Sequence, residues 1–400
     1  MGWKFDAQVL VAALLLGQFG IFYLSAYRCE YDSTHALRSP DSLTALVVSD
    51  VHLLGKRRRV WIERLWIDMQ VQAALAWYIA SSLRAAVHVH RPDVVLVLGD
   101  QLDEGGYPTS DPDYESYVAR FKTAFASTSS VETIYLVQYN SVHCGTSARA
   151  MADVFASQIG NHDSAFGRFL TPAAIARHER AFGLSNYATT VKGHRIVCLN
   201  TMALDADVAD VEVHAQASSF LETLARESTH GQRADQSTIL LSHLPLFRKD
   251  DLACGAERVR EEGHVTYEHP SFEYETHHHV LSDALSQDLL TKLGPDVVLS
   301  GHTHAWCAYE HPPHSSTGST AKEFTVPAFS WGQRPDPSYA LLHIAGRDAY
   351  VSRCALPREP LVFALYGGTL VVLVLRLLWR GIAMKSRSPS RLHDQGKKLK

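Results

Sequence analysis

Short apolar runs alternate along the chain with longer helical or polar stretches. Runs rich in Val, Ile and Leu that end abruptly at polar residues or glycine predict buried strands. They are Ala45–Ser49, Val94–Leu98, Thr133–Val137, Arg195–Asn200, Thr238–Ser242 and Val297–Ser300. A long helical stretch, roughly residues 61–90, separates the first two, and Phe324–Val326 and Tyr339–Ile344 resemble further strands. This alternation predicts a layered α/β domain with buried central strands.

Both ends of the chain carry apolar stretches long enough for a membrane helix. Val9–Ala26 has no charge and is close to the roughly 20 residues that cross a bilayer, so it is either a membrane anchor or a cleaved signal peptide. Leu361–Leu375 is a second such stretch, with a buried core helix as its alternative, and Arg376 after it would have to snorkel to the interface.

The last residues are basic, which places the tail in the cytosol by the positive-inside rule and the region between the two stretches in the lumen. The predicted organisation is an N-terminal anchor or signal peptide in residues 1–30 and a lumenal domain in residues 40–356. A transmembrane helix follows in residues 360–384, and a cytosolic tail in residues 385–400.

Composition narrows the classes of function. The net charge is −4, so no global positive field attracts the chain to nucleic acid. Six cysteines among 400 residues do not make a disulfide scaffold, but they permit one or two bridges in an oxidising compartment.

Polar residues follow the predicted strands in a fixed order. The motifs are Asp50-Val51-His52, Gly99-Asp100, Gly160-Asn161-His162-Asp163, Ser242-His243 and Gly301-His302-Thr303-His304. Because binding sites in open α/β sheets form at the carboxyl ends of strands, these side chains are expected to converge on one edge. Carboxylate and amide oxygens mixed with imidazoles favour Mn, Fe or Zn over Ca. The pattern therefore predicts a dinuclear metal site, where the ions would lower the pKa of an attacking water.

This constellation resembles the calcineurin-like metallophosphoesterase superfamily. The resemblance implies a four-layer α/β/β/α sandwich flanked by the two membrane helices. It assigns one metal ion to Asp50, His52, Asp100 and His304. It assigns the other to Asp100, Asn161, His243 and His302, so that Asp100 bridges the ions. His162 takes the family's catalytic position beside the scissile phosphate, where it protonates or stabilises the leaving oxygen.

A narrower resemblance covers most of the chain. Gly99–Gly105, Gly160–Arg168, His243–Arg248, Ser300–Cys307 and Thr325–Trp331 are similar to segments of the GPI-anchor-remodelling phosphoesterases. The resemblance implies removal of an ethanolamine phosphate from a mannose of GPI anchors, with GPI-anchored proteins as substrates. It also implies two divalent ions, usually Mn²⁺, and a place in the endoplasmic reticulum and early Golgi membrane.

The chain ends Lys397-Lys398-Leu399-Lys400, the dilysine pattern that the coat machinery reads for retrieval to the endoplasmic reticulum; the alternative is a generic basic tail.

Other activities stay open, because fold does not fix substrate. The chain could be a lumenal phosphodiesterase for a nucleotide or a phospholipid, or a catalytically dead membrane scaffold. A redox adaptor is disfavoured because the chain lacks a Cys-x-x-Cys motif.

One segment departs from the family pattern. Residues Gln138–Gln158 separate the predicted strand Thr133–Val137 from the Gly-Asn-His-Asp motif, which the family places almost directly after the strand. The segment shows neither helical nor strand periodicity, and compact domains seldom carry such long loops. It is either an untranslated stretch retained in the gene model or a surface loop. On the first interpretation, its deletion preserves or raises activity and stability.

Several further residues have two interpretations. Asp103 is a partner for His52 or His162, or a turn cap. Arg248 is a phosphate clamp or a structural ion pair, and Trp331 is a glycan-stacking residue or, more typically, core. The run His277–His279 and the loop containing His311 and His314 are expected to be solvated. Cys254 and Cys307 follow loops that must meet at the metals, which predicts a disulfide in an oxidising lumen; the alternative is two free, partly buried thiols.

Overall fold

The computed structural model describes residues 2–31, 42–56, 67–106, 109–126, 155–205, 207–231, 236–261, 268–313 and 320–386. The predicted strand Thr133–Val137, residues 138–154 of the predicted insertion, His314 and the dilysine end lie outside the described residues. Contacts divide the chain into two units, residues 22–356 and the two ends, residues 1–21 and 357–400.

The larger unit contains two mixed sheets. The first has the order β11-β10-β1-β2-β3, with β1 (Leu43–Val48), β2 (Val94–Val97), β3 (Phe155–Ser157), β10 (Ser338–Ala345) and β11 (Asp348–Ala355). The second has the order β4-β5-β6-β7-β9-β8, with β4 (Tyr187–Val191), β5 (His194–Cys198), β6 (Thr238–Leu241), β7 (Val297–Ser300), β8 (Cys307–His311) and β9 (Ala321–Thr325). Strands β1, β2 and β3 are parallel, as are β5, β6, β7 and β9.

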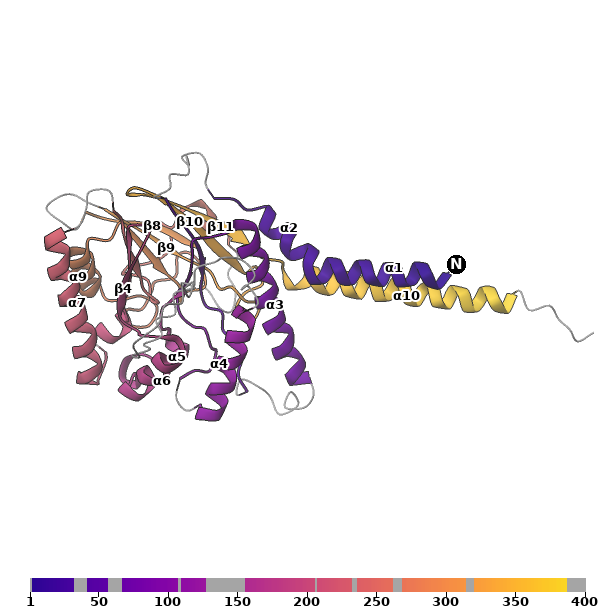
Figure 1. Ribbon diagram of the computed structural model, residues 1–400, viewed down its shortest axis with the longest axis horizontal. Helices are drawn as coiled ribbons and strands as arrows, with labels where there is room; N and C mark the ends of the chain where they lie inside the picture. The colour runs from indigo at the N-terminus through magenta and orange to yellow at the C-terminus, as the bar shows by residue number, and fades with distance from the viewer. Residues whose placement is uncertain are drawn as a thin grey trace, which may run out of the picture. The chain divides into compact units, whose positions relative to one another are not determined.

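The two sheets pack face to face with helices outside. Side chains such as Val47 and Leu241 form the core between the sheets, while Leu240 faces outward to a second core with Leu221 and Leu289. Helices α3 (Ile67–His90) and α4 (Asp111–Ala126) lie on one side, and α7 (Val211–Gly231) and α9 (Asp283–Leu293) lie on the other (Figure 1). Fully apolar strands suit a sheet covered on both faces. The predicted four-layer α/β/β/α sandwich is confirmed.

Local sequence signals set the helix ends. The Ser282 hydroxyl accepts a hydrogen bond from the Leu285 N–H and caps α9, and Gly294 ends it at φ 54°. Thr171 caps α6 (Pro172–Phe182) in the same way, with Pro172 in the first turn. The shorter helices are α5 (Asn161–Ser164) and α8 (Gly255–Val259).

The strand before the Gly-Asn-His-Asp motif corrects the predicted insertion. Phe155–Ser157 forms β3 beside β2, with Phe155 opposite Val95. Gln158 is buried, donates its backbone N–H to Val97 O at 2.8 Å, and donates its side chain to Leu199 O at 2.7 Å. Residues 155–158 therefore belong to the sheet and not to an insertion, because they fill the strand position that the motif requires. Strands β4, β8 and β11 were also not predicted from the sequence.

The two ends of the chain form apolar helices. The N-terminal one comprises α1 (Gly2–Leu15), a π-helical turn (Leu16–Gly20) and α2 (Ile21–Tyr27), and the C-terminal one is α10 (Glu359–Ser386). Trp3–Tyr27 and Glu359–Ala383 are long and apolar enough to cross a membrane, by length and composition. Asp6 Oδ1 lies 2.8 Å from Arg376 Nε and pairs also with Arg380. Arg376, which was predicted to snorkel, therefore has an acidic partner on the other helix.

Two disulfides join distant segments of the larger unit. Cys254–Cys307 confirms the predicted bridge, and Cys29–Cys354, which was not predicted, joins the end of the N-terminal helix to β11. Cys198 is buried and free.

Removing the Cys254–Cys307 bridge is expected to destabilise the domain. It closes a loop of 53 residues, for which the chain-entropy model gives about 4 kcal/mol. Urea unfolding of Cys254→Ser/Cys307→Ser should show this loss relative to the parent protein, with Cys198→Ala as a variant that breaks no bridge. Peptide mapping without reduction that found both thiols free would contradict the bridge.

Candidate metal centre

The predicted ligands come together at one edge of the two sheets. Asp50 and His52 follow β1, Asp100 follows β2, Asn161 begins α5 after β3, His243 follows β6, and His302 and His304 follow β7. These strands are parallel within their sheets, so their carboxyl ends lie at the same edge. The structure therefore brings together all of the side chains that the sequence motifs proposed.

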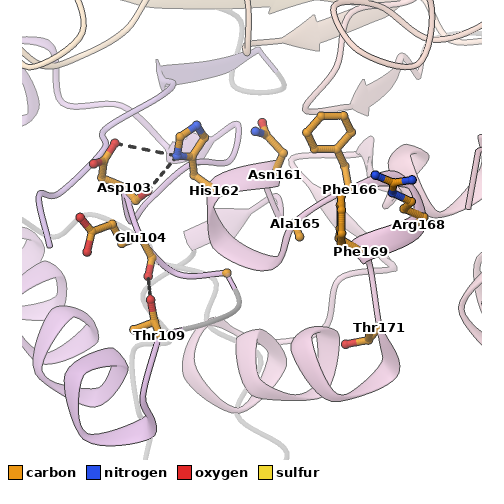
Figure 2. A pocket seen from close by; sticks show the side chains of 11 residues that line it. Asp103, Glu104, Thr109, Asn161, His162, Ala165, Phe166, Arg168, Phe169 and Thr171 are labelled. Atoms are coloured by element: carbon orange, nitrogen blue, oxygen red, sulfur yellow. Dashed lines mark hydrogen bonds and ion pairs between the residues drawn. The ribbon is translucent and has the colours of Figure 1, made fainter. Parts of the chain in front are cut away.

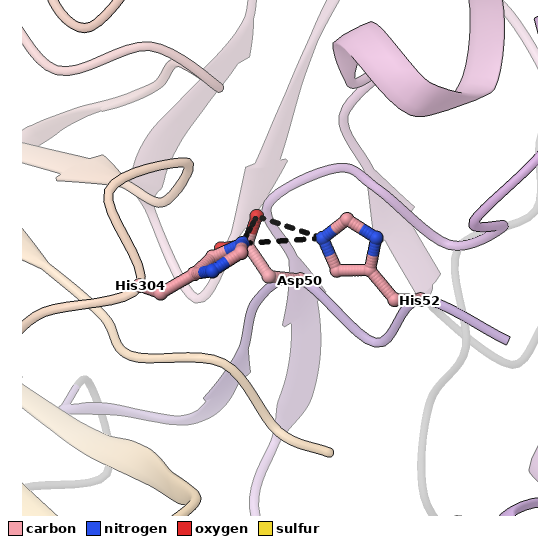
Figure 3. Close-up of side chains that lie close together, drawn as sticks. All are labelled: Asp50, His52 and His304. Carbon is pink, nitrogen blue, oxygen red and sulfur yellow. Dashed lines mark hydrogen bonds and ion pairs between the residues drawn. The ribbon is translucent and has the colours of Figure 1, made fainter. Parts of the chain in front are cut away.

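A first group surrounds Asp50. His304 Nε2 lies 3.4 Å from Asp50 Oδ1, and the Nε2 atoms of His52 and His304 are only 3.2 Å apart (Figure 3). Asp50 Oδ1 is buried and forms no hydrogen bond to any described residue. Asp100 Oδ2 completes the group at 3.4 Å from His52 Nε2. A carboxylate and two imidazoles directed at one buried point match a metal site.

A second group surrounds the other oxygen of Asp100. His243 Nε2 lies 3.4 Å from Asp100 Oδ1 and 2.8 Å from Asn161 Oδ1, and His302 Nδ1 lies 2.9 Å from the same Asn161 oxygen. The other ring nitrogens face backbone carbonyls, His243 Nδ1 to Leu98 O at 2.8 Å and His302 Nε2 to His278 O at 2.7 Å. A carbonyl oxygen only accepts hydrogen bonds, so His243 Nδ1 and His302 Nε2 carry the ring hydrogen. The other ring nitrogens, which face Asn161, therefore offer lone pairs. Lone pairs and oxygens that converge in this way fit a cation between them.

The backbone at these residues is strained. Asp50, His52, Asp100, His302 and His304 all have φ between 44° and 68°, a region that few residues other than glycine adopt. Such strain costs about 1–3 kcal/mol per residue and persists where the surroundings impose it, typically at functional sites. Most of the predicted ligands thus have a strained backbone, which is typical of functional sites and is independent of the sequence motifs.

Asp103 supports two histidines. Its carboxylate oxygen Oδ1 lies 3.2 Å from His52 Nδ1 and 3.8 Å from His162 Nδ1, and its carbonyl oxygen lies 2.8 Å from His162 Nδ1. The predicted role of Asp103 as a partner of His52 or His162 is confirmed for both. His162 Nδ1 must donate to the carbonyl, so its Nε2 atom is left to face a ligand.

Electrostatics in the site favour ionised carboxylates. Burial opposes ionisation of Asp50, yet the attraction of His304 outweighs it and holds the pKa of Asp50 well below its usual value. Burial also disfavours protonated His52, but the hydrogen bond that His52 donates to Asp103 raises the pKa of His52 to about 10. Burial lowers the pKa of His302 to about 3, so this imidazole is neutral. Metal binding at such a site displaces protons from the imidazoles.

Asp163 was missed by the sequence analysis as a positioning residue. Its carboxylate accepts from the N–H of Gly160 at 2.9 Å and from the N–H of Leu102 at 3.0 Å. It therefore ties the loop after β2 to the loop after β3. Burial, aided by the charge of Asp100, raises the pKa of Asp163 to about 7. The fourth position of the Gly-Asn-His-Asp motif was the signal that could have identified it.

A buried charge network that contacts the loop after β7 was also missed. Arg334 donates to the His304 carbonyl and lies 3.2 Å from Glu261 Oε1, while Glu261 accepts from the Trp306 N–H at 3.3 Å. The loop that carries His302 and His304 is thus held by charged side chains from distant segments. Glu261 and Arg334 are far apart in sequence and outside any motif, so no local signal marks them.

The structure also places four other features that the sequence analysis singled out. Arg248 is a structural residue, because it is buried and its Nε atom lies 2.8 Å from Asp251 Oδ1. His311 is not solvated as predicted, since it is buried against Glu323 at 2.8 Å. His277 pairs with Asp205 at 2.8 Å, so the run His277–His279 is only partly a solvated loop. Trp331 is partly buried and packs on Tyr78 with ring centroids 3.9 Å apart.

Comparisons with known proteins agree with this geometry. The family model for calcineurin-like phosphoesterases matches residues 43–306. The chain belongs to this family. It is therefore a metallophosphoesterase with an α/β fold, and the family implies binding of divalent metal ions.

Similar curated proteins cover nearly the whole chain. Metallophosphoesterase 1 of Mus musculus is 30% identical over 389 residues, which cover 92% of this chain and 87% of the mouse protein. The Metallophosphoesterase 1 homolog of Caenorhabditis elegans is 28% identical, with coverage of 96% and 94%. A crystal structure of a Vps29 mutant from Entamoeba histolytica covers 79% of this chain and 100% of that chain, at 11% identity and a TM-score of 0.24. That score is too low to compare the folds in detail.

Proposed function

We propose that this metallophosphoesterase removes an ethanolamine phosphate from a mannose of GPI anchors. The observation that carries the proposal is the convergence of two ligand groups on Asp100, directly beside His162. The similarity to Metallophosphoesterase 1 over most of the chain and the apolar helices at both ends support it.

Each ligand group would hold one divalent ion, and its mixed oxygen and imidazole donors suit Mn²⁺. The first would use Asp50, His52, Asp100 and His304, and the second would use Asp100, Asn161, His243 and His302. When bound, such ions lower the pKa of water and neutralise charge on the phosphoryl group.

His162 is the proposed general acid. Its Nδ1–H donates to the Asp103 carbonyl at 2.8 Å, and the Asp103 carboxylate oxygen Oδ1 lies 3.8 Å from the same nitrogen. The Nε2 atom is then oriented to give its proton to the leaving sugar oxygen. The side chain is about 30% exposed, so it can reach a bound substrate.

A lumenal position in a membrane is proposed for the catalytic domain. Two disulfides are typical of an oxidising compartment. The pair of Asp6 with Arg376 favours retention of the N-terminal helix as an anchor, because cleavage would leave Arg376 unpaired in the bilayer. The basic tail after α10 favours the cytosol for both termini.

A phosphodiesterase for nucleotides or phospholipids is the competing function, and a release assay separates the two. The purified full chain, loaded with Mn²⁺, should release ethanolamine phosphate from a GPI glycan faster than it cleaves nucleotide or lipid phosphodiesters. In cells that lack the remodelling activity, the parent chain should restore it and Asp100→Asn should not. Faster cleavage of a nucleotide or lipid would reject the proposal, and a protein without bound metal would favour a scaffold.

The dilysine end is proposed to bind the retrieval coat. Replacement of Lys397 and Lys398 by serine should move the protein from the endoplasmic reticulum to the Golgi and the cell surface, as seen by fluorescence microscopy. Replacement of Lys385 and Arg387, which keeps the dilysine end, is the matched control for loss of basic charge. An unchanged distribution of the first variant would contradict retrieval.

A further inference from the structure

A cavity of about 770 Å³ opens beside the metal ligands. Asn161 and His162 line it near the metal centre, and Phe166 and Phe169 line it farther along the same loop (Figure 2). Arg168 stands at its edge, with its guanidinium carbon 4.8 Å from the centre of the Phe169 ring. The cavity therefore joins the candidate catalytic side chain to two aromatic faces and a cation.

Phe169 is unusually exposed for an aromatic residue, at 63%. Exposed apolar surface beside a polar site marks a place where a ligand binds. Phe166 is half-buried and packs against the core that also contains Leu170 and Ile175, so core packing holds its ring in place beside Phe169.

The loop that presents these rings has a constrained backbone. Ala165 has φ 75° and Gly167 has φ 57°, both in the region that favours glycine. A side chain at residue 167 would overlap with the carboxylate of Asp207, so the loop lies close against that residue. Strain that the surroundings impose next to a metal centre is typical of a segment shaped for a ligand.

The direction of the reaction identifies which part of the substrate enters the cavity. His162 lines the cavity, and in the proposed function it protonates the leaving oxygen. The alcohol that leaves must therefore extend from His162 into the cavity. Its chemistry must suit two aromatic side chains and the hydrogen-bond donors of Arg168, and a sugar ring offers an apolar face together with hydroxyl groups.

We propose that this cavity is a hexose subsite, in which the mannose that carries the phosphate stacks on Phe166 and Phe169 while Arg168 donates hydrogen bonds to its hydroxyls. The proposal rests on the proposed function and adds the residues that select a sugar over a simple alcohol. It predicts that Phe169 governs recognition of the leaving group and leaves the phosphate chemistry unchanged.

Two substrates that share the same diester test this. One is a methyl mannoside that carries ethanolamine phosphate, and the other is methyl ethanolamine phosphate, which lacks the sugar. For the full chain loaded with Mn²⁺, Phe169→Ala should raise KM for the mannoside about tenfold and leave the methyl diester unchanged. Phe169→Tyr should restore the KM, since it keeps the aromatic face, and Val211→Ala is the matched control at another exposed apolar residue.

Binding gives a second readout that does not require turnover. Saturation-transfer NMR with a phosphonate analogue of the mannoside should show transfer to the sugar ring protons in the parent chain and in Phe169→Tyr, and a weaker transfer in Phe169→Ala. Failure of the parent chain to cleave the mannoside would reject the proposed function. Cleavage of the mannoside with a KM unaffected by Phe169→Ala, or an equal loss on both diesters, would reject the sugar subsite alone.

Discussion

Asp100→Asn is expected to abolish phosphoesterase activity and to deplete the protein of metal. The Asp100 carboxylate faces both ligand groups, with Oδ2 3.4 Å from His52 Nε2 and Oδ1 3.4 Å from His243 Nε2. An amide is similar in size but removes the negative charge that both groups share. Because the metal ions contribute several kcal/mol to transition-state stabilisation, kcat/KM should fall at least about 10³-fold. Elemental analysis should find less metal per protein chain in the purified variant than in the parent protein.

His162→Ala is the matched variant for this test. His162 donates its backbone N–H to Asp100 Oδ1 at 2.8 Å, a contact that alanine retains, and the proposed metal assignment gives its side chain no metal. Loss of a general acid typically lowers the rate by about 10²–10⁴-fold. The variant should therefore keep its metal and lose most of its turnover. If His162→Ala lost its metal while Asp100→Asn kept it, the assignment of the two residues would be wrong.

The convergence of the candidate metal ligands could be predicted because these residues obey a local rule. Each candidate ligand follows an apolar run within a few residues, and parallel strands bring such positions to one edge. The Cys254–Cys307 bridge followed from the same rule, since both cysteines lie after loops that meet there. The order of the motifs along the chain was therefore enough to predict which side chains converge.

The residues that hold the ligands in place follow no such rule. Glu261 and Arg334 contact the loop after β7 from segments that are distant in sequence, and their pairing depends on the complete fold. The bridge from Cys29 to Cys354 depends likewise on where β11 begins and ends, and the sequence pattern did not predict that strand. Tertiary contacts of this kind leave no periodic signal in the sequence.

The third strand of the first sheet was not predicted from the sequence, and the predicted strand Thr133–Val137 lies outside the described residues. Thr133–Val137 has the stronger strand composition, but the structure pairs Phe155–Ser157 with β2. Only a short strand is needed there, and its position is set by the hydrogen bonds of Gln158 and by the motif that follows. Deletion of residues 138–158 would therefore also remove Phe155–Ser157, a strand of the described sheet.

Gly160→Ala is expected to disrupt the candidate metal centre, although glycine has no side chain that could bind a metal ion. The φ and ψ angles of Gly160 are −109° and 171°, which alanine adopts without strain, so its backbone does not require glycine. A Cβ atom at this position would instead lie 2.9 Å from Asp100 Cγ and would overlap with Asp100 Oδ1 and its backbone nitrogen. Either the Asp100 carboxylate or the loop that carries Asn161 and His162 must shift. A misplacement of about 1 Å can cost roughly 10²-fold in rate, so activity and metal content should both fall.

Gly183→Ala separates this steric effect from a general loss of stability. Gly183 has φ 97°, and no atom lies within 4 Å of the position that a Cβ atom would occupy, so alanine there adds strain without a clash. That strain costs about 1–3 kcal/mol, and thermal unfolding should detect it while metal content and kcat/KM stay at the level of the parent chain. Gly160→Ala with normal metal content would show that the loop after β3 can yield to one methyl group. The close approach of Gly160 to Asp100 would then have no part in shaping the metal centre, and the positions of Asn161 and His162 would depend instead on Asp163, whose carboxylate accepts from the Gly160 N–H.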